Sequence, residues 1–75
     1  MVKIPSLSGR DIVKILEKIG YRKIRQRGSN IRLSAPKRKS VTVPDYGEID
    51  QSLIRKILRD ADLSADQFRK LAAEE

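Results

Sequence analysis

Three short stretches between residues 21 and 43 alternate apolar and polar side chains, and this pattern leaves the chain few choices of fold. A period of two is typical of β-strands that have one buried and one solvated face. The pattern predicts strands at about 21–27, 30–34 and 40–43, with a turn at Gly28-Ser29 and a loop with a basic tip at 35–39. The predicted inward residues are Ile24, Ile31, Leu33, Val41 and Val43.

The residues before the first strand repeat with the spacing of a helix instead. Ser8 and Asp11 are spaced as a capping box, and Gly20 can end a helix with a positive φ angle. We therefore expect a helix at about 9–19. Its apolar stripe consists of Ile12, Ile15, Leu16 and Ile19.

A second helical pattern follows the third strand. Asp50 can act as the N-cap of a helix at about 51–61, whose apolar stripe contains Ile54, Ile57, Leu58 and Ala61. The segment from Ser64 to Gln67 is a second capping box, and it predicts a short C-terminal helix. That helix has Phe68, Leu71 and Ala72 on one side.

These elements define an α+β fold of the order α-β-β-β-α, with a short helix at the end. The 75 residues allow one domain, 1–75, with a core at about 8–71. Both helices must cover the apolar face of a three-stranded antiparallel sheet, because nothing else can bury their stripes. The order suggests the fold of double-stranded-RNA-binding domains. The open face of the sheet is expected to carry Lys23, Arg25, Arg27, Asn30, Arg32 and Thr42.

The charge is distributed very unevenly along the chain. Seventeen basic and ten acidic residues give a net charge of +7, but residues 1–43 carry +10 and residues 44–75 carry −3. The segment 18–44 holds nine basic residues and no acid. A block of this kind is the usual electrostatic footprint of nucleic-acid binding. The alternative is a solvated basic face that only keeps the protein soluble, and a membrane surface is disfavoured because the charges follow strand spacing.

The composition also excludes several functions. The chain has no Cys and no His, so disulfides, thiolate metal sites and imidazole chemistry are excluded. We expect no metal and no cofactor. The longest apolar run is Leu71–Ala73, and residues 1–8 lack the apolar core of a signal peptide, so we expect a cytoplasmic protein without membrane contact.

Four segments, taken in order, give the chain a narrower resemblance. They are Gly20-Tyr21, Gln26-Arg27-Gly28-Ser29-Asn30, Val41-Thr42-Val43-Pro44 and Leu53-Ile54-Arg55-Lys56-Ile57-Leu58-Arg59. The set resembles the HicA-type mRNA interferase toxins over roughly residues 8–71. Ser52-Leu53 falls where that family usually has Thr-Leu.

The resemblance implies a small endoribonuclease of a toxin–antitoxin pair that cleaves mRNA without a metal. The family's catalytic His directly follows the Gly-Ser turn, and Asn30 stands at that position here. A second His often follows the Val-Pro pair, and here that position is Tyr46. The chain therefore matches the frame of the family and lacks its catalyst, which predicts weak or absent cleavage.

Three explanations for Asn30 stay open. The protein is catalytically dead and retained for binding, it uses another proton donor, or Asn30 was introduced to disable a toxic nuclease. Tyr46, Tyr21 and Lys23 could transfer a proton only with a strongly lowered pKa. Asn30 also has a purely structural explanation, because Asn suits the residue after a Gly-Ser turn.

The expected partners are RNA and a cognate antitoxin, and a homodimer is left open. Expected RNA contacts come from Lys23, Arg25, Arg27, Ser29, Arg32, Lys37, Arg38, Lys39 and Tyr46, around Asn30 at the catalytic position. Tyr46 could stack on a base, or its ring could simply pack over the loop. The rival function is a non-catalytic RNA-binding module of the same fold.

Overall fold

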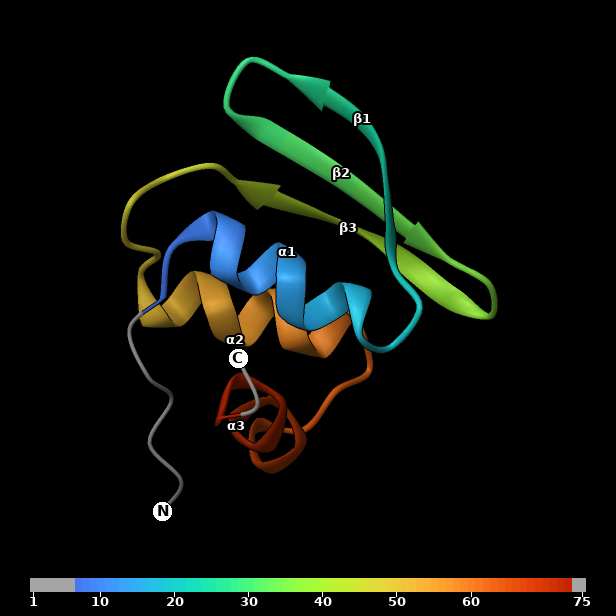
Figure 1. Ribbon diagram of the computed structural model, residues 1–75, viewed down its shortest axis with the longest axis vertical. Coiled ribbons are helices and arrows are strands. Elements are labelled where there is room, and N and C mark those ends of the chain that lie inside the picture. Colours follow the sequence, from blue (N-terminus) through green and yellow to red (C-terminus); the bar gives the residue numbers. More distant parts are fainter. Residues whose placement is uncertain (1–6, 74–75) are drawn as a thin grey trace.

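The computed structural model describes residues 7–73 and confirms the predicted α+β class. The three strands form one antiparallel sheet in the order β1-β2-β3. α1 and α2 cover one face of the sheet, and α3 lies beyond them, on the side away from the strands (Figure 1). The elements are α1 (Gly9–Glu17), β1 (Arg22–Arg27), β2 (Asn30–Ala35), β3 (Arg38–Pro44), α2 (Gln51–Asp60) and α3 (Ala65–Ala73).

Local capping explains where the helices begin. The Asp11 amide donates to Ser8 Oγ at 3.1 Å, and the Ser8 amide donates back to Asp11 Oδ2 at 3.2 Å. Ser64 and Gln67 form the same reciprocal pair at 3.1 and 3.2 Å, so both predicted capping boxes are confirmed. The predicted C-terminal ends were slightly late, since α1 stops at Glu17 and α2 stops at Asp60.

The start of α1 is fixed against the end of β3 by a close backbone contact. A Cβ atom on Gly9 would clash with the carbonyl oxygen of Pro44. The Gly9 amide also donates to the carbonyl of Tyr46 at 2.9 Å. Only glycine lets these two backbones approach so closely.

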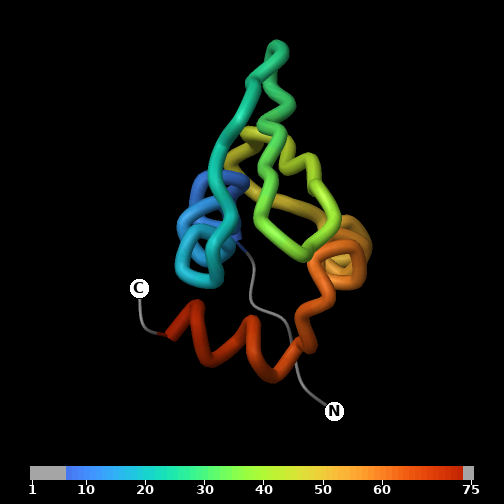
Figure 2. Tube along the Cα trace, turned by 90° about the vertical axis from the view of Figure 1, so that its right-hand side faces the viewer, coloured from blue at the N-terminus to red at the C-terminus, as the bar shows by residue number. Residues whose placement is uncertain are grey.

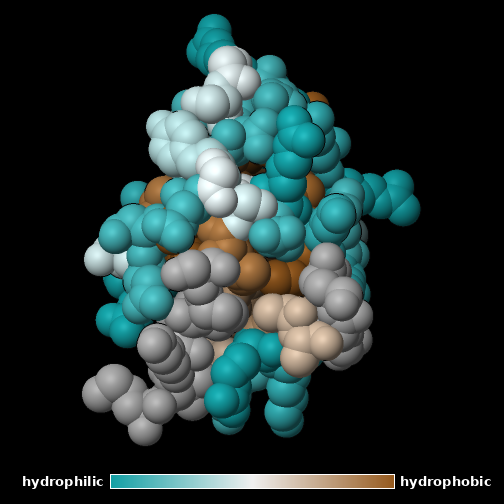
Figure 3. All heavy atoms as spheres, turned by 60° about the vertical axis from the view of Figure 1, so that its left-hand side comes forward, coloured by the Kyte–Doolittle hydropathy of each residue, from teal (hydrophilic) through white to brown (hydrophobic). Residues whose placement is uncertain are grey.

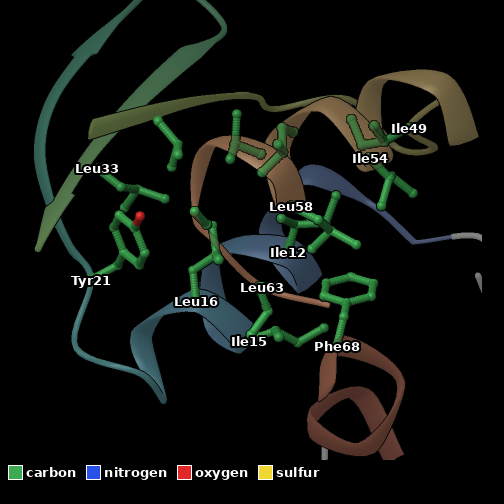
Figure 4. Packing of buried hydrophobic residues seen from close by; sticks show 14 of the residues in the cluster. Ile12, Ile15, Leu16, Tyr21, Leu33, Ile49, Ile54, Leu58, Leu63 and Phe68 are labelled. Atoms are coloured by element: carbon green, nitrogen blue, oxygen red, sulfur yellow. The ribbon is translucent and has the colours of Figure 1, made fainter. Parts of the chain in front are cut away.

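The core lies between the sheet and the helices α1 and α2, and it continues between these helices and α3 (Figure 4). Tyr21 and Phe68 are its largest fully buried side chains, and Phe68 brings α3 into the core. Within residues 7–73 no charged residue is buried, and the hydroxyl of Tyr21 is the one polar side-chain group among the buried residues. The other large side chains that are fully buried are Ile12, Ile15, Leu16, Leu33, Ile49, Ile54 and Val43.

The first strand departs from the prediction. The register pairs Lys23 with Leu33 and then Arg25 with Arg32, so Ile24 is an extra residue in a β-bulge. Ile24 is 60% exposed, and every residue of β1 is exposed. The prediction that Ile24 belongs to the buried face was therefore wrong, because an inserted residue breaks strict alternation.

The connection between β2 and β3 is also tighter than predicted. The expected loop at 35–39 is a two-residue turn at Pro36-Lys37, since Ala35 is buried and pairs with Arg38. Lys37 has a φ angle of +65°, which is the conformation a type II turn needs after a proline. The third strand consequently begins at Arg38, not at residue 40.

The β1–β2 hairpin extends beyond the helical layer (Figure 2). Seen from the side in Figure 3, hydrophilic atoms cover the upper part of the molecule, which is the sheet in Figure 1, and hydrophobic atoms reach the surface mainly in the middle. In the part of the chain that the structure describes, no helix is long and apolar enough to cross a bilayer.

Candidate nucleic-acid interface

The face of the sheet opposite the helices contains a shallow hollow of about 180 Å³, called the arginine hollow here. All three strands contribute to it. Arg25 pairs with Arg32, Arg32 pairs with Thr42, and Arg27 pairs with Asn30, so these side chains share one face. Its lining residues are Arg25, Arg27, Asn30, Arg32 and Thr42.

Asn30 occupies the rim of this hollow because of the turn that precedes it. Gly28 has a φ angle of +59°, which allows the tight reversal from β1 into β2. The amide of Asp45 donates to the carbonyl of Ser29 at 2.6 Å and ties the turn to the end of β3. Asn30 is exposed there, so its amide group can reach a bound molecule.

The electrostatics of the arginine hollow suit an anion. Guanidinium groups stay protonated at any physiological pH and bind phosphate oxygens through a fork of N–H donors. Among the described residues, no carboxylate lies within ion-pair distance of Arg25, Arg27 or Arg32. Arg32 is oriented by a hydrogen bond from its Nη1 to Thr42 Oγ1 at 3.2 Å. Three positive charges therefore converge on one small site without a competing acid.

Lys23 lies on the other face of the sheet, contrary to the prediction. It pairs with the buried Leu33, and the bulge at Ile24 reverses the alternation between Lys23 and Arg25. Lys23 lines a separate hollow of about 330 Å³ between β1 and α1. The other lining residues of that hollow are Arg10, Val13, Lys14, Glu17, Gln26, Ile31 and Asp45.

The basic residues of the β2–β3 turn do not converge with the arginine hollow. Asn30 begins β2 and the turn follows its end, six residues later, which is about 20 Å at the rise of a strand. Arg38 donates from Nη1 to the carbonyl of Ala61 at 2.6 Å, so it caps the end of α2. Lys37 and Lys39 are exposed at this far end of the sheet.

Tyr46 and Ser29 lie in the connections near Asn30 but do not line the arginine hollow. The Tyr46 residue is 54% exposed, and its carbonyl oxygen accepts the hydrogen bond from Gly9. Thr42 lines the arginine hollow, although it was not among the RNA contacts expected from the sequence. Its alternation indicated the open face, but its contact with Arg32 depends on the cross-strand register, which the sequence does not reveal.

Tyr21 is unsuited to proton transfer near neutral pH. Its ring is 1% exposed and its hydroxyl donates to the carbonyl of Lys39 at 2.8 Å. Burial raises the pKa of the Tyr21 phenol above its ordinary value of 10.0, and the nearby Arg38 only partly opposes this effect. The hydroxyl therefore stays protonated and structural.

The fold and the site define a small αβββα domain with an arginine-lined hollow on its open face. The profile of the HicA toxin family of bacterial toxin–antitoxin systems matches residues 9–63, which include α1, all three strands and α2. The chain belongs to the HicA toxin family. Membership implies RNA targets and a cognate antitoxin in general terms. No curated protein matches the chain in a direct comparison.

Proposed function

We propose that this chain is an RNA-binding toxin of its family that cleaves mRNA weakly or not at all, because Asn30 stands where the family carries its catalytic His. The observation that carries the proposal is the position of Asn30 in the arginine hollow, beside Arg25, Arg27 and Arg32. The arginines hold the phosphodiester, and the group that should move the proton is an amide.

The chemistry explains why one residue matters so much. Cleavage of RNA without a metal needs a base for the 2′-hydroxyl proton and an acid for the leaving 5′-oxygen. An Asn side chain has no protonation equilibrium near neutral pH, so it only donates and accepts hydrogen bonds. Loss of general acid–base help typically costs about 10²–10⁴ in rate. The arginines still stabilise charge that develops on the phosphate.

None of the other residues considered for proton transfer lines the arginine hollow. Tyr21 is buried, Lys23 faces α1, and Tyr46 is not among the lining residues. The second candidate function is a non-catalytic RNA-binding module. The lining of the arginine hollow favours this second candidate. In the described residues it consists of cations, an amide and a hydroxyl, and none of these groups titrates near pH 7.

A binding experiment tests RNA binding at the arginine hollow, which both candidate functions require. We would titrate a labelled single-stranded RNA with the protein at several salt concentrations and compare the variant Arg25→Ala/Arg27→Ala with the wild type. At about 0.7 per phosphate contact, the slope of log K against log salt should fall by up to about 1.4. Arg69→Ala/Lys70→Ala is the matched control, because it removes the same charge from exposed positions on α3.

Equal slopes for the two double variants would contradict binding at the arginine hollow. Binding that does not depend on salt would contradict a phosphate site of any kind.

A further inference from the structure

A second hollow adjoins the arginine hollow and shares two of its residues. This edge hollow, of about 170 Å³, lies where β3 meets α2, and Arg32 and Thr42 line both hollows. The remaining lining residues are Ser40, Val41, Leu53, Lys56, Ile57 and Asp60. β3 is an edge strand in the β1-β2-β3 order, and α2 packs beside it (Figure 1).

The edge hollow is more polar than apolar, and it combines a cation with a few apolar side chains. Val41 and Ile57 are buried and Leu53 is half-buried, whereas Lys56 is exposed on α2. Within residues 7–73, Lys56 forms no ion pair. A nucleotide presents a charged phosphate beside a less polar sugar and base, so this combination matches the chemistry of one further nucleotide. Among residues 7–73 no strand pairs with the outer edge of β3, so this edge adds unpaired backbone donors.

We propose that an RNA strand bound in the arginine hollow continues over the edge of β3 into the edge hollow, where Lys56 holds a second phosphate. This inference rests on the proposed function and adds the direction of the strand. Asp60 is the only acid that lines this path in the described part of the chain, and it weakens the binding of a phosphate there.

The opposite direction is less favourable. The hollow between β1 and α1 shares no lining residue with the arginine hollow, and it contains two acids, Glu17 and Asp45. Asp45 already pairs with Arg10 at 3.3 Å, so one of the cations on that side is engaged. A strand that crossed β1 would have to leave one face of the sheet for the other, and it would meet these two acids among the cations Arg10, Lys14 and Lys23.

Oligonucleotides of different length test the path. A dinucleotide has one phosphate, which the arginines hold, whereas an octanucleotide reaches the edge hollow. Both carry 2′-O-methyl riboses, so that residual activity cannot shorten them. Lys56→Ala should weaken octanucleotide binding several-fold, lower its salt slope by about 0.7, and leave dinucleotide binding unchanged. Lys70→Ala, on α3, is the control and should change neither.

Asp60→Asn provides a test that a folding defect cannot imitate, because this variant should bind the octanucleotide more tightly than the wild type. The path is overturned if Lys56→Ala binds the octanucleotide with full affinity and slope, or if it weakens both ligands equally. If the path is overturned in this way but Arg25→Ala/Arg27→Ala still loses binding to both ligands, the proposed function stands. If the wild type binds neither ligand, the proposed function fails and the path fails with it.

Discussion

The guanidinium of Arg32 on β2 donates a hydrogen bond to the hydroxyl of Thr42 on β3, across 3.2 Å. Thr42 is therefore the one side chain within residues 7–73 that is seen to orient an arginine of the arginine hollow. The pair also stands at the border between the arginine hollow and the edge hollow. An Arg32 held in place loses less side-chain freedom when it binds a phosphate.

Thr42→Val should weaken RNA binding with little effect on stability. Valine keeps the shape and the β-propensity of threonine but removes the acceptor for Arg32. Without this hydrogen bond Arg32 must be ordered when it binds a phosphate, and ordering one such side chain costs about 0.5–1.5 kcal/mol, so we expect a loss of affinity of up to about tenfold. Thr42→Ser keeps the hydroxyl and should bind nearly as well as the wild type. Equal losses for both variants would show that the hydroxyl does not position Arg32.

Gly9→Ala should destabilise the fold. The new Cβ atom would meet the Pro44 carbonyl oxygen, and overpacking of this kind costs about 1–3 kcal/mol. Gly47→Ala is the control, because a Cβ atom there meets nothing within 4 Å. Urea unfolding measures both free energies. A Gly9→Ala protein as stable as Gly47→Ala would mean that α1 and the end of β3 do not approach as described.

The two isoleucines of the β1–β2 hairpin should respond very differently to truncation. Ile24→Ala should change the free energy of unfolding by no more than about 0.5 kcal/mol, as is usual for an exposed position. Ile31→Ala, at a site that is 5% exposed, should cost about 2–5 kcal/mol. Similar losses at both sites would support strict alternation of β1 and contradict the bulge.

Tyr21 should make the protein less stable in alkaline solution. Its pKa is raised in the folded state, so its contribution is complete below the ordinary pKa of 10.0 and is lost as the pH rises through the higher folded value. Tyr21→Phe removes the hydrogen bond to Lys39 and should cost about 0.5–1.5 kcal/mol at neutral pH. The variant should also lose less stability than the wild type above pH 10. Parallel pH profiles would contradict a buried phenol.

The features that the sequence predicted well are local ones. Ser8 with Asp11 and Ser64 with Gln67 form capping boxes within four residues, so sequence spacing alone identifies them. The helical stripes and the open basic face also follow from periodicity. The arginines of the candidate site could be assigned to that face because alternation holds from Arg25 onward.

The features that could not be predicted from the sequence depend on contacts between distant segments. A bulge at Ile24 has no signature in the sequence, and it moved Lys23 to the other face. The Arg38 side chain was expected to be free for RNA, but it donates to Ala61, which is 23 residues away. Lys56 reaches the neighbourhood of Arg32 only because α2 packs against β3.

Cleavage of a long RNA in the presence of EDTA, by the wild type and by Asn30→His, tests the central claim most directly. We expect the wild type to cleave poorly and the variant to cleave at least about 10² faster, with a rate that follows the titration of the new imidazole. Asn30→Gln is the matched control, since it changes the side chain without adding a titrating group, and it should stay inactive. A wild type that cleaves as fast as Asn30→His would contradict the account, because another residue would then be the catalyst.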